Sequence, residues 1–287
     1  MGGLGNQMFQ YALGRRLSIT HHTDLKVDIQ DLMDRSPKDY SFRELKLNEF
    51  NIDLKIAGPE DRKKFYLDGR TRPARIKGRL LRSLSGHHIY YEPTNLFAPE
   101  ILKAGKNAYM AGYWQTEKYF NEIRPALLAD FQPKNPVNGT AEAVAVQIKS
   151  SESVSIHVRR GDYVHNKAAA DFLGACSLKY YENAMEMITR TIKEPRFFIF
   201  SDDVAWVKEN LHIDYPSHIM ENFPDHVDMH LMSLCKHNII ANSSFSWWAA
   251  WLNPNQSKMV IYPRKWHKDA TVDSSDMIPP GWQNAEN

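Results

Sequence analysis

An apolar run passes into a charged loop in the stretch Ser155-Ile156-His157-Val158-Arg159-Arg160-Gly161-Asp162-Tyr163. A short apolar run that ends in charged residues is typical of a buried strand that delivers a loop to the edge of a sheet. Arg159 and Arg160 carry the same charge and cannot pair with each other, and a planar guanidinium group matches the oxygens of a phosphate. We therefore interpret this loop as the part of the protein that holds the phosphate leaving group of a donor substrate.

The C-terminal half of the chain alternates short apolar runs with helical patterns. We expect strands at 154–158, 197–200, 217–220, 238–241 and 259–262, and helices at 178–192, 204–211, 225–236 and 245–252. This alternation predicts an α/β fold in which helices cover a parallel sheet.

The N-terminal half has fewer regular patterns. Strands are expected at 25–29 and 108–113, and helices at 8–18, at 141–148 and in a segment that ends at 128. The breaker-rich stretch 133–139 is the predicted link between the halves. We accordingly divide the chain into two domains, 1–150 and 151–287.

A glycine-rich turn, Gly2-Gly3-Leu4-Gly5-Asn6-Gln7, leads into the first helix. Such a turn presents free backbone N–H groups to an anion at the helix N-terminus. A buried strand normally precedes a turn of this kind, and the sequence offers none, so we expect the first strand of the N-terminal sheet to be missing. The alternative is a flexible start of the chain.

Three polar segments follow predicted strands of the C-terminal half, at 157–163, 200–203 and 242–248. Ligands of parallel sheets bind beyond the carboxyl ends of the strands, so we expect the three segments to share one rim. Arg159 and Arg160 would neutralise a pyrophosphate at this rim.

The other two segments supply matching candidates. The hydroxyl groups of Ser243, Ser244 and Ser246, together with free amides at a helix start, form a second phosphate cradle. Asp202 and Asp203 would accept hydrogen bonds from a ribose or a base, and guanine offers two donors that match one carboxylate. In the alternative interpretation, one of these aspartates only caps its helix.

Two further stretches of the N-terminal half are candidates for binding. Trp114 and Gln115 follow a predicted strand and form a candidate sugar platform, with a core tryptophan beside a helix cap as the alternative. Between residues 62 and 82, nine Lys and Arg residues stand against a single acidic residue, Asp68. This basic stretch is a candidate surface for an anionic membrane or a polyanionic acceptor, and a solvated helical face is the alternative.

Composition narrows the class of protein. The 287 residues carry a net charge of +2, which gives no general affinity for nucleic acid. Cys176 and Cys235 lie in apolar helical patterns and predict buried free thiols. No apolar run approaches the roughly 20 residues that span a bilayer, and no signal peptide precedes the first motif. We therefore expect a soluble, cytoplasmic protein, unless it docks peripherally on the inner face of the membrane.

The sequence contains no Asp-x-Asp motif and no histidine spacing typical of a metal site. We therefore expect no metal cofactor, and arginine must then carry the charge of the leaving group. Asp162 lies in the arginine loop and is the best candidate for a catalytic base. An aspartate that only clamps Arg160 is the alternative.

Taken together, these segments resemble the bacterial alpha-1,2-fucosyltransferases of glycosyltransferase family 11. The resemblance covers nearly the whole chain and rests on the segments 2–12, 112–115, 157–163, 200–203 and 229–252. It implies an α/β fold of the GT-B class, in which two Rossmann-like domains with parallel sheets face each other across a cleft. The donor would be GDP-fucose, bound by the C-terminal domain. The acceptor would be a galactose-terminated oligosaccharide, fucosylated at O2 of its terminal beta-galactoside with inversion and without a metal ion.

The resemblance also implies roles for single residues. Arg159 matches the key phosphate-binding arginine, and Asn6 matches an asparagine that leans over the donor from the N-terminal domain. Further donor contacts fall on His157, Arg160, Asp202 or Asp203, and on Ser243, Ser244, Phe245 and Ser246. Arg159, His157 and Asp162 form the predicted catalytic set, and Trp114 and Gln115 the predicted acceptor contact.

Two rival functions stay open at this point. The first is a fucosyltransferase that makes another linkage, such as alpha-1,6. The second is a protein that binds a nucleotide sugar or a glycan without catalysing transfer.

Overall fold

The computed structural model describes residues 1–34, 43–65, 84–165, 167–269 and 271–286. The chain divides into two compact units. Unit 1 comprises Met1–Asn48 and Ile52–Asp130, and unit 2 comprises Glu49–Asn51 and Phe131–Asn287. Residues 131–150, expected from the sequence in the N-terminal domain, therefore pack with unit 2.

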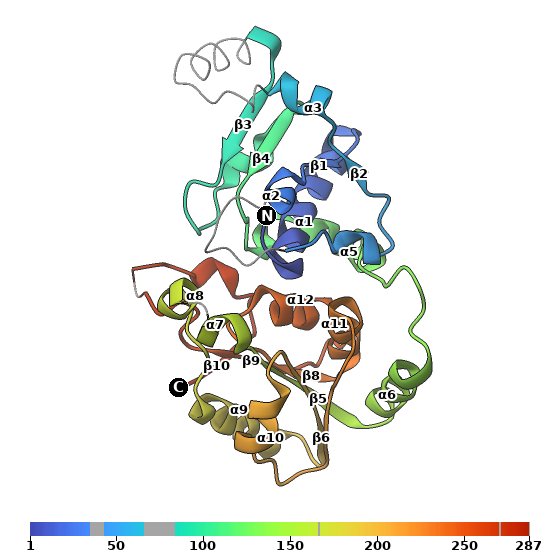
Figure 1. Cartoon of the computed structure of the whole chain (residues 1–287), viewed down its shortest axis with the longest axis vertical. Coiled ribbons are helices and arrows are strands. Elements are labelled where there is room, and N and C mark those ends of the chain that lie inside the picture. The colour runs from blue at the N-terminus through green and yellow to red at the C-terminus, as the bar shows by residue number, and fades with distance from the viewer. Residues whose placement is uncertain (35–42, 66–83, 166, 270, 287) are drawn as a thin grey trace. The chain divides into compact units, whose positions relative to one another are not determined.

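Unit 2 is built on a six-stranded parallel sheet with the strand order β10-β9-β8-β5-β6-β7 (Figure 1). Its strands are β5 (Glu152–Val158), β6 (Pro195–Ser201), β7 (Ser217–Ile219), β8 (His237–Ile239), β9 (Val260–Pro263) and β10 (Gln283–Ala285). The strands expected from the sequence are confirmed. The strand β10 was not expected, because its residues, Gln-Asn-Ala, carry no apolar pattern.

The strand β5 comes first in the chain but lies inside the sheet. The chain adds β6 and β7 on one side of β5 and then returns to add β8, β9 and β10 on the other. This is the strand order of a Rossmann fold, whose ligands bind in the crevice where the direction of strand addition reverses. In this sheet the reversal lies between β5 and β8.

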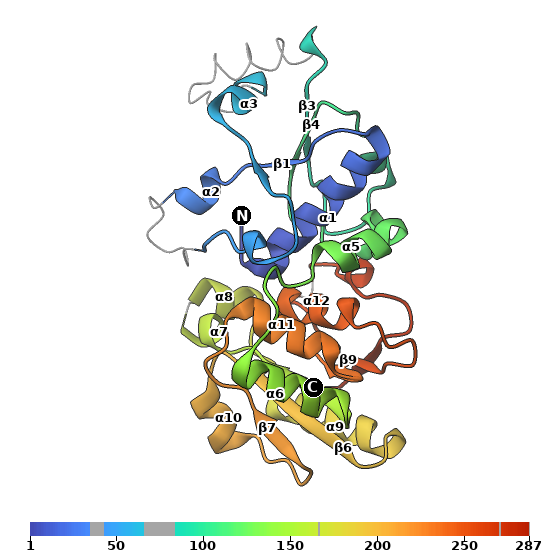
Figure 2. The same ribbon diagram turned by 90° about the vertical axis from the view of Figure 1, so that its right-hand side faces the viewer.

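Helices cover both faces of the sheet. They are α6 (Gly139–Lys149), α7 (Gly161–His165), α8 (Lys167–Phe172), α9 (Leu178–Thr191), α10 (Val204–Asn210), α11 (Asp225–Leu234) and α12 (Ser244–Leu252), with the short turn η5 (Ser275–Met277). On one face, Tyr181 and Ile188 of α9 and Val207 of α10 join the apolar core of β5 and β6. The helices α6, α11 and α12 pack together in the other layer (Figure 2). Right-handed crossovers require this division, because the direction of strand addition reverses at β5.

Unit 1 contains much less sheet. Its elements are α1 (Leu4–His21), β1 (Lys26–Val27), α2 (Gln30–Met33), β2 (Lys55–Ile56), α3 (Pro59–Lys64), β3 (His88–Tyr91), β4 (Ala108–Ala111) and α5 (Arg124–Asp130). Short helical turns are η1 (Leu47–Glu49), η2 (Pro99–Lys103), η3 (Glu117–Tyr119) and η4 (Asn121–Ile123). The strand β1 pairs with β2 and β3 pairs with β4, both parallel, so the described residues form two separate two-stranded sheets. The two strands expected from the sequence are present in shortened form.

The helix α1 organises the core of unit 1. The Phe9 ring packs 5.9 Å from that of Phe120. The Tyr11 hydroxyl and Arg15 Nε both donate to Asp130 Oδ2 at 2.9 Å. Burial and the neighbouring carboxylate raise the pKa of Tyr11, so its hydroxyl remains a donor. These bonds tie α1 to the end of α5.

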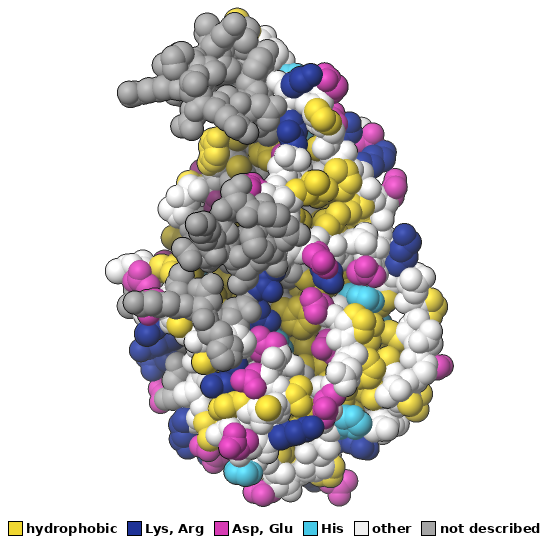
Figure 3. Space-filling view, in the orientation of Figure 1, with side chains coloured by type: hydrophobic (Ala, Val, Ile, Leu, Met, Phe, Trp, Pro, Cys, Tyr) yellow, Lys and Arg dark blue, Asp and Glu magenta, His cyan; other side chains and the backbone are white. Residues whose placement is uncertain are grey.

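The surface expectations are tested only in part. Most of the basic stretch 62–82 lies outside the described residues, which include its first four positions, so membrane contact stays a prediction. In the view of Figure 3, acidic and basic side chains are interspersed outside the grey residues.

Within the described ranges, no helix is long and apolar enough to cross a membrane. Cys176 and Cys235 are buried free thiols, as predicted.

Candidate functional site

The three polar segments do meet at one edge of the unit 2 sheet. They follow β5, β6 and β8, and β5 is hydrogen-bonded to both of the other strands. Val158 at the end of β5 stands opposite Ser201 at the end of β6, and Ile156 stands opposite Ile239 at the end of β8. The prediction of a shared rim is therefore confirmed at the strand reversal, where Rossmann folds bind ligands.

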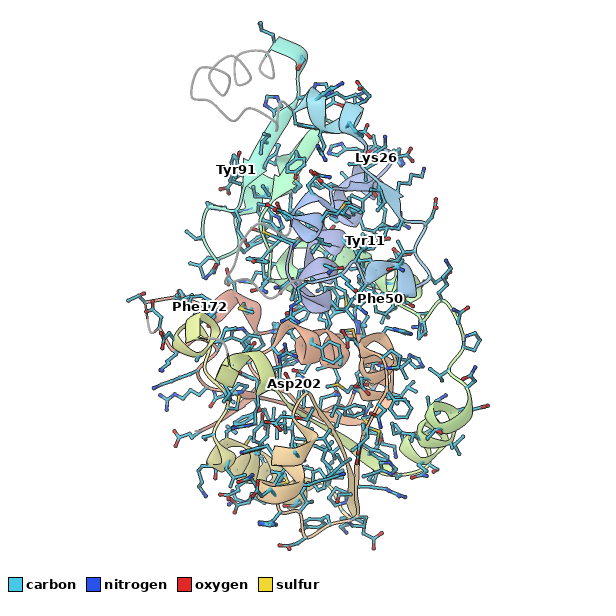
Figure 4. The ribbon with its side chains drawn as sticks, viewed as in Figure 1. Tyr11, Lys26, Phe50, Tyr91, Phe172 and Asp202 are labelled. Carbon is cyan, nitrogen blue, oxygen red and sulfur yellow. The ribbon has the colours of Figure 1, made fainter. Side chains whose placement is uncertain are left out.

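The carboxylate of Asp202 holds the arginine loop in place (Figure 4 labels this residue). It accepts hydrogen bonds from the amides of Arg160 (2.9 Å) and Gly161 (3.1 Å), and Arg159 Nη1 lies 3.1 Å from Asp202 Oδ2. A Cβ on residue 161 would lie 2.7 Å from Asp202 Oδ2, so the contact requires glycine there. The structure therefore gives Asp202 an internal role, fixing the loop and orienting Arg159, in place of the ribose or base contact expected from the sequence.

Asp203 caps the next helix. Its Oδ1 accepts a hydrogen bond from the Trp206 amide at 3.1 Å, at the start of α10. Its Oδ2 lies 3.6 Å from Arg160 Nε. For Asp203 the alternative interpretation, a helix cap, is the one that the structure supports.

The two adjacent arginines have different neighbours. The guanidinium of Arg160 lies over the Trp206 ring, 4.0 Å from its centre, and its Nε is buried and forms no hydrogen bond with any described residue. The guanidinium of Arg159 lies 5.7 Å from the centre of the Tyr163 ring. The two arginines, expected to neutralise a pyrophosphate together, therefore differ in their surroundings. Arg160 packs onto α10, and Asp202 holds Arg159. The side chain of Asp162, the candidate base, lies outside the described part of the structure.

The start of α12 forms only part of the expected phosphate cradle. Ser243 is the N-cap, and its Oγ accepts a hydrogen bond from the Phe245 amide at 3.3 Å. Ser246 is fully buried, and its hydroxyl donates to the carbonyls of Ala241 and Ser243, both at 3.4 Å. Ser243 and Ser246 thus stabilise the turn, and Ser244 is the serine of the three that is partly exposed.

His157 is buried at the end of β5 beside Phe245, with their ring centres 5.4 Å apart. Burial and the positive charge of Arg159 lower the pKa of His157 to about 3. The imidazole is therefore neutral at physiological pH. Its Nδ1 is buried, and none of the described residues forms a hydrogen bond with it. A buried polar atom of this kind calls for a partner from a ligand or water.

Asp228, on α11, is a candidate that the sequence interpretation missed. Its Oδ1 is buried and has no hydrogen-bond partner in the part of the chain that the structure describes. Burial, with Asp225 adding a smaller effect, raises the pKa of Asp228 to about 7. The helix follows β7 and packs against β6, so it begins at the same carboxyl edge as the three loops. In the sequence, the feature that could have pointed to Asp228 is its place one helical turn before the apolar pair Leu231 and Met232, which is buried.

In unit 1, Trp114 and Gln115 do not form the sugar platform expected from the sequence. Trp114 is a core residue, because its side chain is only 1% exposed and packs edge-on against Tyr119. It is not an exposed sugar platform. Gln115 Nε2 donates to Asn6 Oδ1 at 2.8 Å, so the structure brings these two predicted residues together.

Two features hold this pair in place. Gly2 has a φ of +78°, and a Cβ there would lie 2.5 Å from Asn6 Nδ2, so the close approach needs glycine. Glu92, which the sequence interpretation missed, accepts hydrogen bonds at 2.7 Å from the amides of Tyr113 and Trp114. Burial raises the pKa of Glu92 against the effect of these bonds. The bonds fix the turn that precedes Gln115.

The described residues contain no group of three or more His, Cys, Asp or Glu side chains that could hold a metal ion. The absence of a metal cofactor therefore stays a prediction, and chelation would test it.

Comparison with known proteins assigns the family. Residues 93–286 match the family model described as glycosyl transferase family 11. The chain belongs to glycosyltransferase family 11. It is 33% identical to the alpha-1,2-colitosyltransferase of Escherichia coli, an alignment that covers 99% of this chain and 97% of the relative. It is 28% identical to the galactoside alpha-(1,2)-fucosyltransferase 2 of Rattus norvegicus over 49% of this chain and 42% of the relative.

The GT-B fold class expected for this family 11 member is confirmed. A mutant of Arabidopsis thaliana FUT1, solved in complex with GDP, superposes with a TM-score of 0.50 and covers 97% of this chain and 73% of its own. The two sequences are 11% identical, so this likeness concerns the fold alone.

Proposed function

We propose that this family 11 glycosyltransferase transfers L-fucose from GDP-fucose to O2 of a terminal beta-galactoside, with inversion and without a metal ion. One observation carries the proposal. Two buried polar atoms, His157 Nδ1 and Asp228 Oδ1, have no hydrogen-bond partner among the described residues, and they belong to the same unit as the Asp202-held Arg159. Such atoms are rare in folded proteins and are commonly satisfied by a ligand.

The chemistry of these groups suits a guanine nucleotide. Guanine presents an N1–H and an exocyclic amino group side by side, and a carboxylate accepts from both. Asp202 and Asp203 were the expected acceptors, but their oxygens serve the loop and the α10 cap. We therefore assign the base contact to Asp228. The neutral His157 supplies a further donor or acceptor.

Arg159 would act on the departing GDP. Glycosyl transfer passes through an oxocarbenium-like transition state, and negative charge builds on the leaving diphosphate as the glycosidic bond breaks. A guanidinium that Asp202 holds in place before reaction stabilises that charge more in the transition state than in the ground state. The partly exposed Ser244 and the first amides of α12 would bind the same diphosphate. Asp162 remains our candidate to take the proton from the acceptor O2.

A second donor has a specific observation in its favour. The relative that is 33% identical along almost the whole chain is named an alpha-1,2-colitosyltransferase. Colitose is fucose without the 3-hydroxyl group, so both donors place the same charges at the rim described above. Colitosyl transfer is therefore the second candidate function.

One assay separates these functions. The purified protein is incubated with GDP-fucose or GDP-colitose and with lactose, with and without EDTA, and the products are analysed by mass spectrometry and NMR. We expect an alpha-1,2-fucosylated lactose, formed at the same rate with EDTA. Transfer of colitose alone, an alpha-1,6 linkage, or GDP-fucose binding without a product would each overturn the proposal in favour of a named rival. Loss of turnover with EDTA would overturn metal independence.

A further inference from the structure

A cavity of about 390 Å³ lies at the carboxyl edge of the unit 2 sheet, which is a volume typical of small-molecule sites. Tyr163 of α7 and residues 173–176 line it on the side of the β5–α9 connection. Asn242 follows β8, and Lys265, His267 and Lys268 follow β9. The cavity therefore belongs to the edge where parallel sheets bind their ligands.

Asn242 fixes the walls of this cavity. Its side chain is buried, and Nδ2 lies within hydrogen-bond distance of three backbone carbonyls, those of Leu173 (3.1 Å), Gly174 (3.0 Å) and Trp266 (3.1 Å). The Asn242 carbonyl accepts a hydrogen bond from the Tyr163 hydroxyl at 3.1 Å. One residue thus joins the segments that follow β5, β8 and β9, and a ligand meets walls that are already in place.

The charge of the cavity wall is positive. Lys265 and Lys268 are exposed, and neither ammonium group forms an ion pair or a hydrogen bond with a described residue. None of the described residues that line the cavity is acidic. Asp269, the next residue along the chain, accepts hydrogen bonds from the Thr271 amide (2.9 Å) and hydroxyl (2.7 Å). The two lysines therefore attract an anion to the cavity.

His267 adds a neutral polar group between the two lysines. Its Nδ1 is buried and forms no hydrogen bond with any described residue, and its ring lies 4.9 Å from that of Phe172, which Figure 4 labels. Burial lowers the pKa of His267, and the charge of Asp269 opposes this effect. The neutral imidazole has one donor and one acceptor, which suit the hydroxyl groups of a sugar.

The order of strands indicates which substrate reaches the cavity. Asp228, the proposed contact of the base, lies on α11, which packs against β6. Arg159 and Ser244, which would bind the diphosphate, follow β5 and β8. The cavity lies farther along the edge, beyond β8 and β9, on the side of the diphosphate that is away from the base. Fucose and colitose are uncharged, so the negative charge that the lysines attract belongs to the acceptor.

We propose that this cavity binds an anionic sugar residue of the acceptor, which carries a carboxylate or a phosphate next to the galactose that receives the fucose. Lys265 and Lys268 bind the anionic group, and His267 contacts the hydroxyl groups. This inference rests on the proposed function and names the class of its acceptor, an acidic oligosaccharide.

Two matched acceptors test the proposal. Lactobionate and lactitol both present a terminal beta-galactoside on an open-chain glucose derivative, and only lactobionate carries a carboxylate. KM and kcat are measured for both acceptors with the unaltered protein, with the double variant Lys265→Gln/Lys268→Gln and with Lys193→Gln. Lys193 is an exposed lysine of unit 2 that does not line the cavity, so its replacement is the matched control.

We expect KM for lactobionate to be about tenfold below that for lactitol in the unaltered protein and in Lys193→Gln, with similar kcat. The double variant should lose this difference, because the carboxylate then has no cation to bind. Equal KM values in the unaltered protein, or a difference that persists in the double variant, would overturn the proposal. A larger rise in KM for GDP-fucose than for lactobionate would also overturn it, because the lysines would then bind the donor.

Binding measurements without a donor separate this inference from the proposed function. Saturation-transfer NMR compares lactobionate, lactitol and inorganic phosphate on the same proteins. Binding of lactobionate in preference to lactitol, lost in the double variant, would support the proposal even if the protein transferred no fucose. Binding of inorganic phosphate through the two lysines, with no preference for lactobionate, would overturn it in favour of a site for a free anion.

Discussion

The two units use the same kind of parallel strand and differ in how completely each strand is covered. In unit 2, six of the seven residues of β5 are buried, and neighbours pair with both of its edges. In unit 1, β1 is two residues long, one of them is exposed, and within the described ranges the strand pairs with β2 alone. A parallel strand is stable when its faces and edges are covered. We therefore expect the sheet of unit 2 to be rigid and the strands of unit 1 to open more easily.

The polar residues of the two candidate sites also differ in their partners. At the rim of unit 2, His157 and Asp228 each keep a buried polar atom without a partner. In unit 1, the predicted residues Asn6 and Gln115 bond to each other. Unpaired buried groups lower stability, and proteins retain them where function needs them. Unit 1 also buries such an atom, Trp114 Nε1, so the units differ in the partners of their predicted polar site residues and not in whether such atoms occur.

Removal of the Arg159 side chain should cause the largest loss of turnover. We expect Arg159→Ala to lower turnover with GDP-fucose by about 10³-fold, as removal of a preorganised charge-stabilising group does, with Tm nearly unchanged. Arg160→Ala is the matched control. Because its guanidinium packs on Trp206, this change should lower Tm and affect turnover much less. Equal losses of turnover in both variants would contradict the division of roles.

Replacement of Asp202 should cause the second-largest loss of turnover, because Asp202 acts on the reaction through Arg159. In Asp202→Asn, the amide group faces the N–H donors of the arginine loop, so we expect turnover to fall by roughly 10²-fold. Asp203→Asn is the control, since asparagine caps a helix as well as aspartate. If Asp202 acts by positioning Arg159, we expect guanidinium salts to restore part of the turnover of Arg159→Ala and none of that of Asp202→Asn. If the two asparagine variants have similar kinetics, the positioning role is wrong.

Asp228 should show opposite effects on binding and stability. Its pKa is raised to about 7, so the folded protein keeps a proton that the unfolded chain loses near pH 4. The stability contributed by the neutral form is therefore lost as pH rises through 7. We expect Asp228→Asn to raise Tm by on the order of 5 °C at pH 8 and little at pH 4, and to weaken GDP binding about tenfold.

Calorimetry across pH 4–8 and GDP titration check the two halves of this prediction separately. A pH-independent Tm difference would show that Asp228 does not titrate as the structure indicates. Unchanged GDP affinity with the expected Tm profile would remove Asp228 from the base contact and leave its burial intact.

The smallest effect is expected for the Asn6–Gln115 pair of unit 1. We expect Asn6→Ala and Gln115→Ala each to reduce turnover by a few-fold, with a coupling free energy of about 1 kcal/mol in a double-mutant cycle. Additive effects would mean that the two residues act independently. A loss for Asn6→Ala as large as that for Arg159→Ala would contradict the ranking of the two units.

Much of unit 2 could be predicted from local pattern. A central parallel strand is buried on both faces, so its consecutive residues are apolar. A run such as Val154–Val158 can therefore be recognised from the sequence alone. The order of strands and helices then places the three polar segments at carboxyl ends. Their meeting at one rim follows from the parallel fold, and they are among the segments by which the sequence resembles glycosyltransferase family 11.

Only the tertiary structure decided what individual side chains do. The adjacent aspartates Asp202 and Asp203 look alike in the sequence, but the path of the chain turns one toward the arginine loop and the other toward the start of α10. Trp114 is in the core for the same kind of reason, and Asp228 Oδ1 is buried with no hydrogen-bond partner among the described residues. Sequence patterns record which segments are buried. The partner of a polar group depends on contacts between segments far apart in the chain, and only the folded structure specifies them.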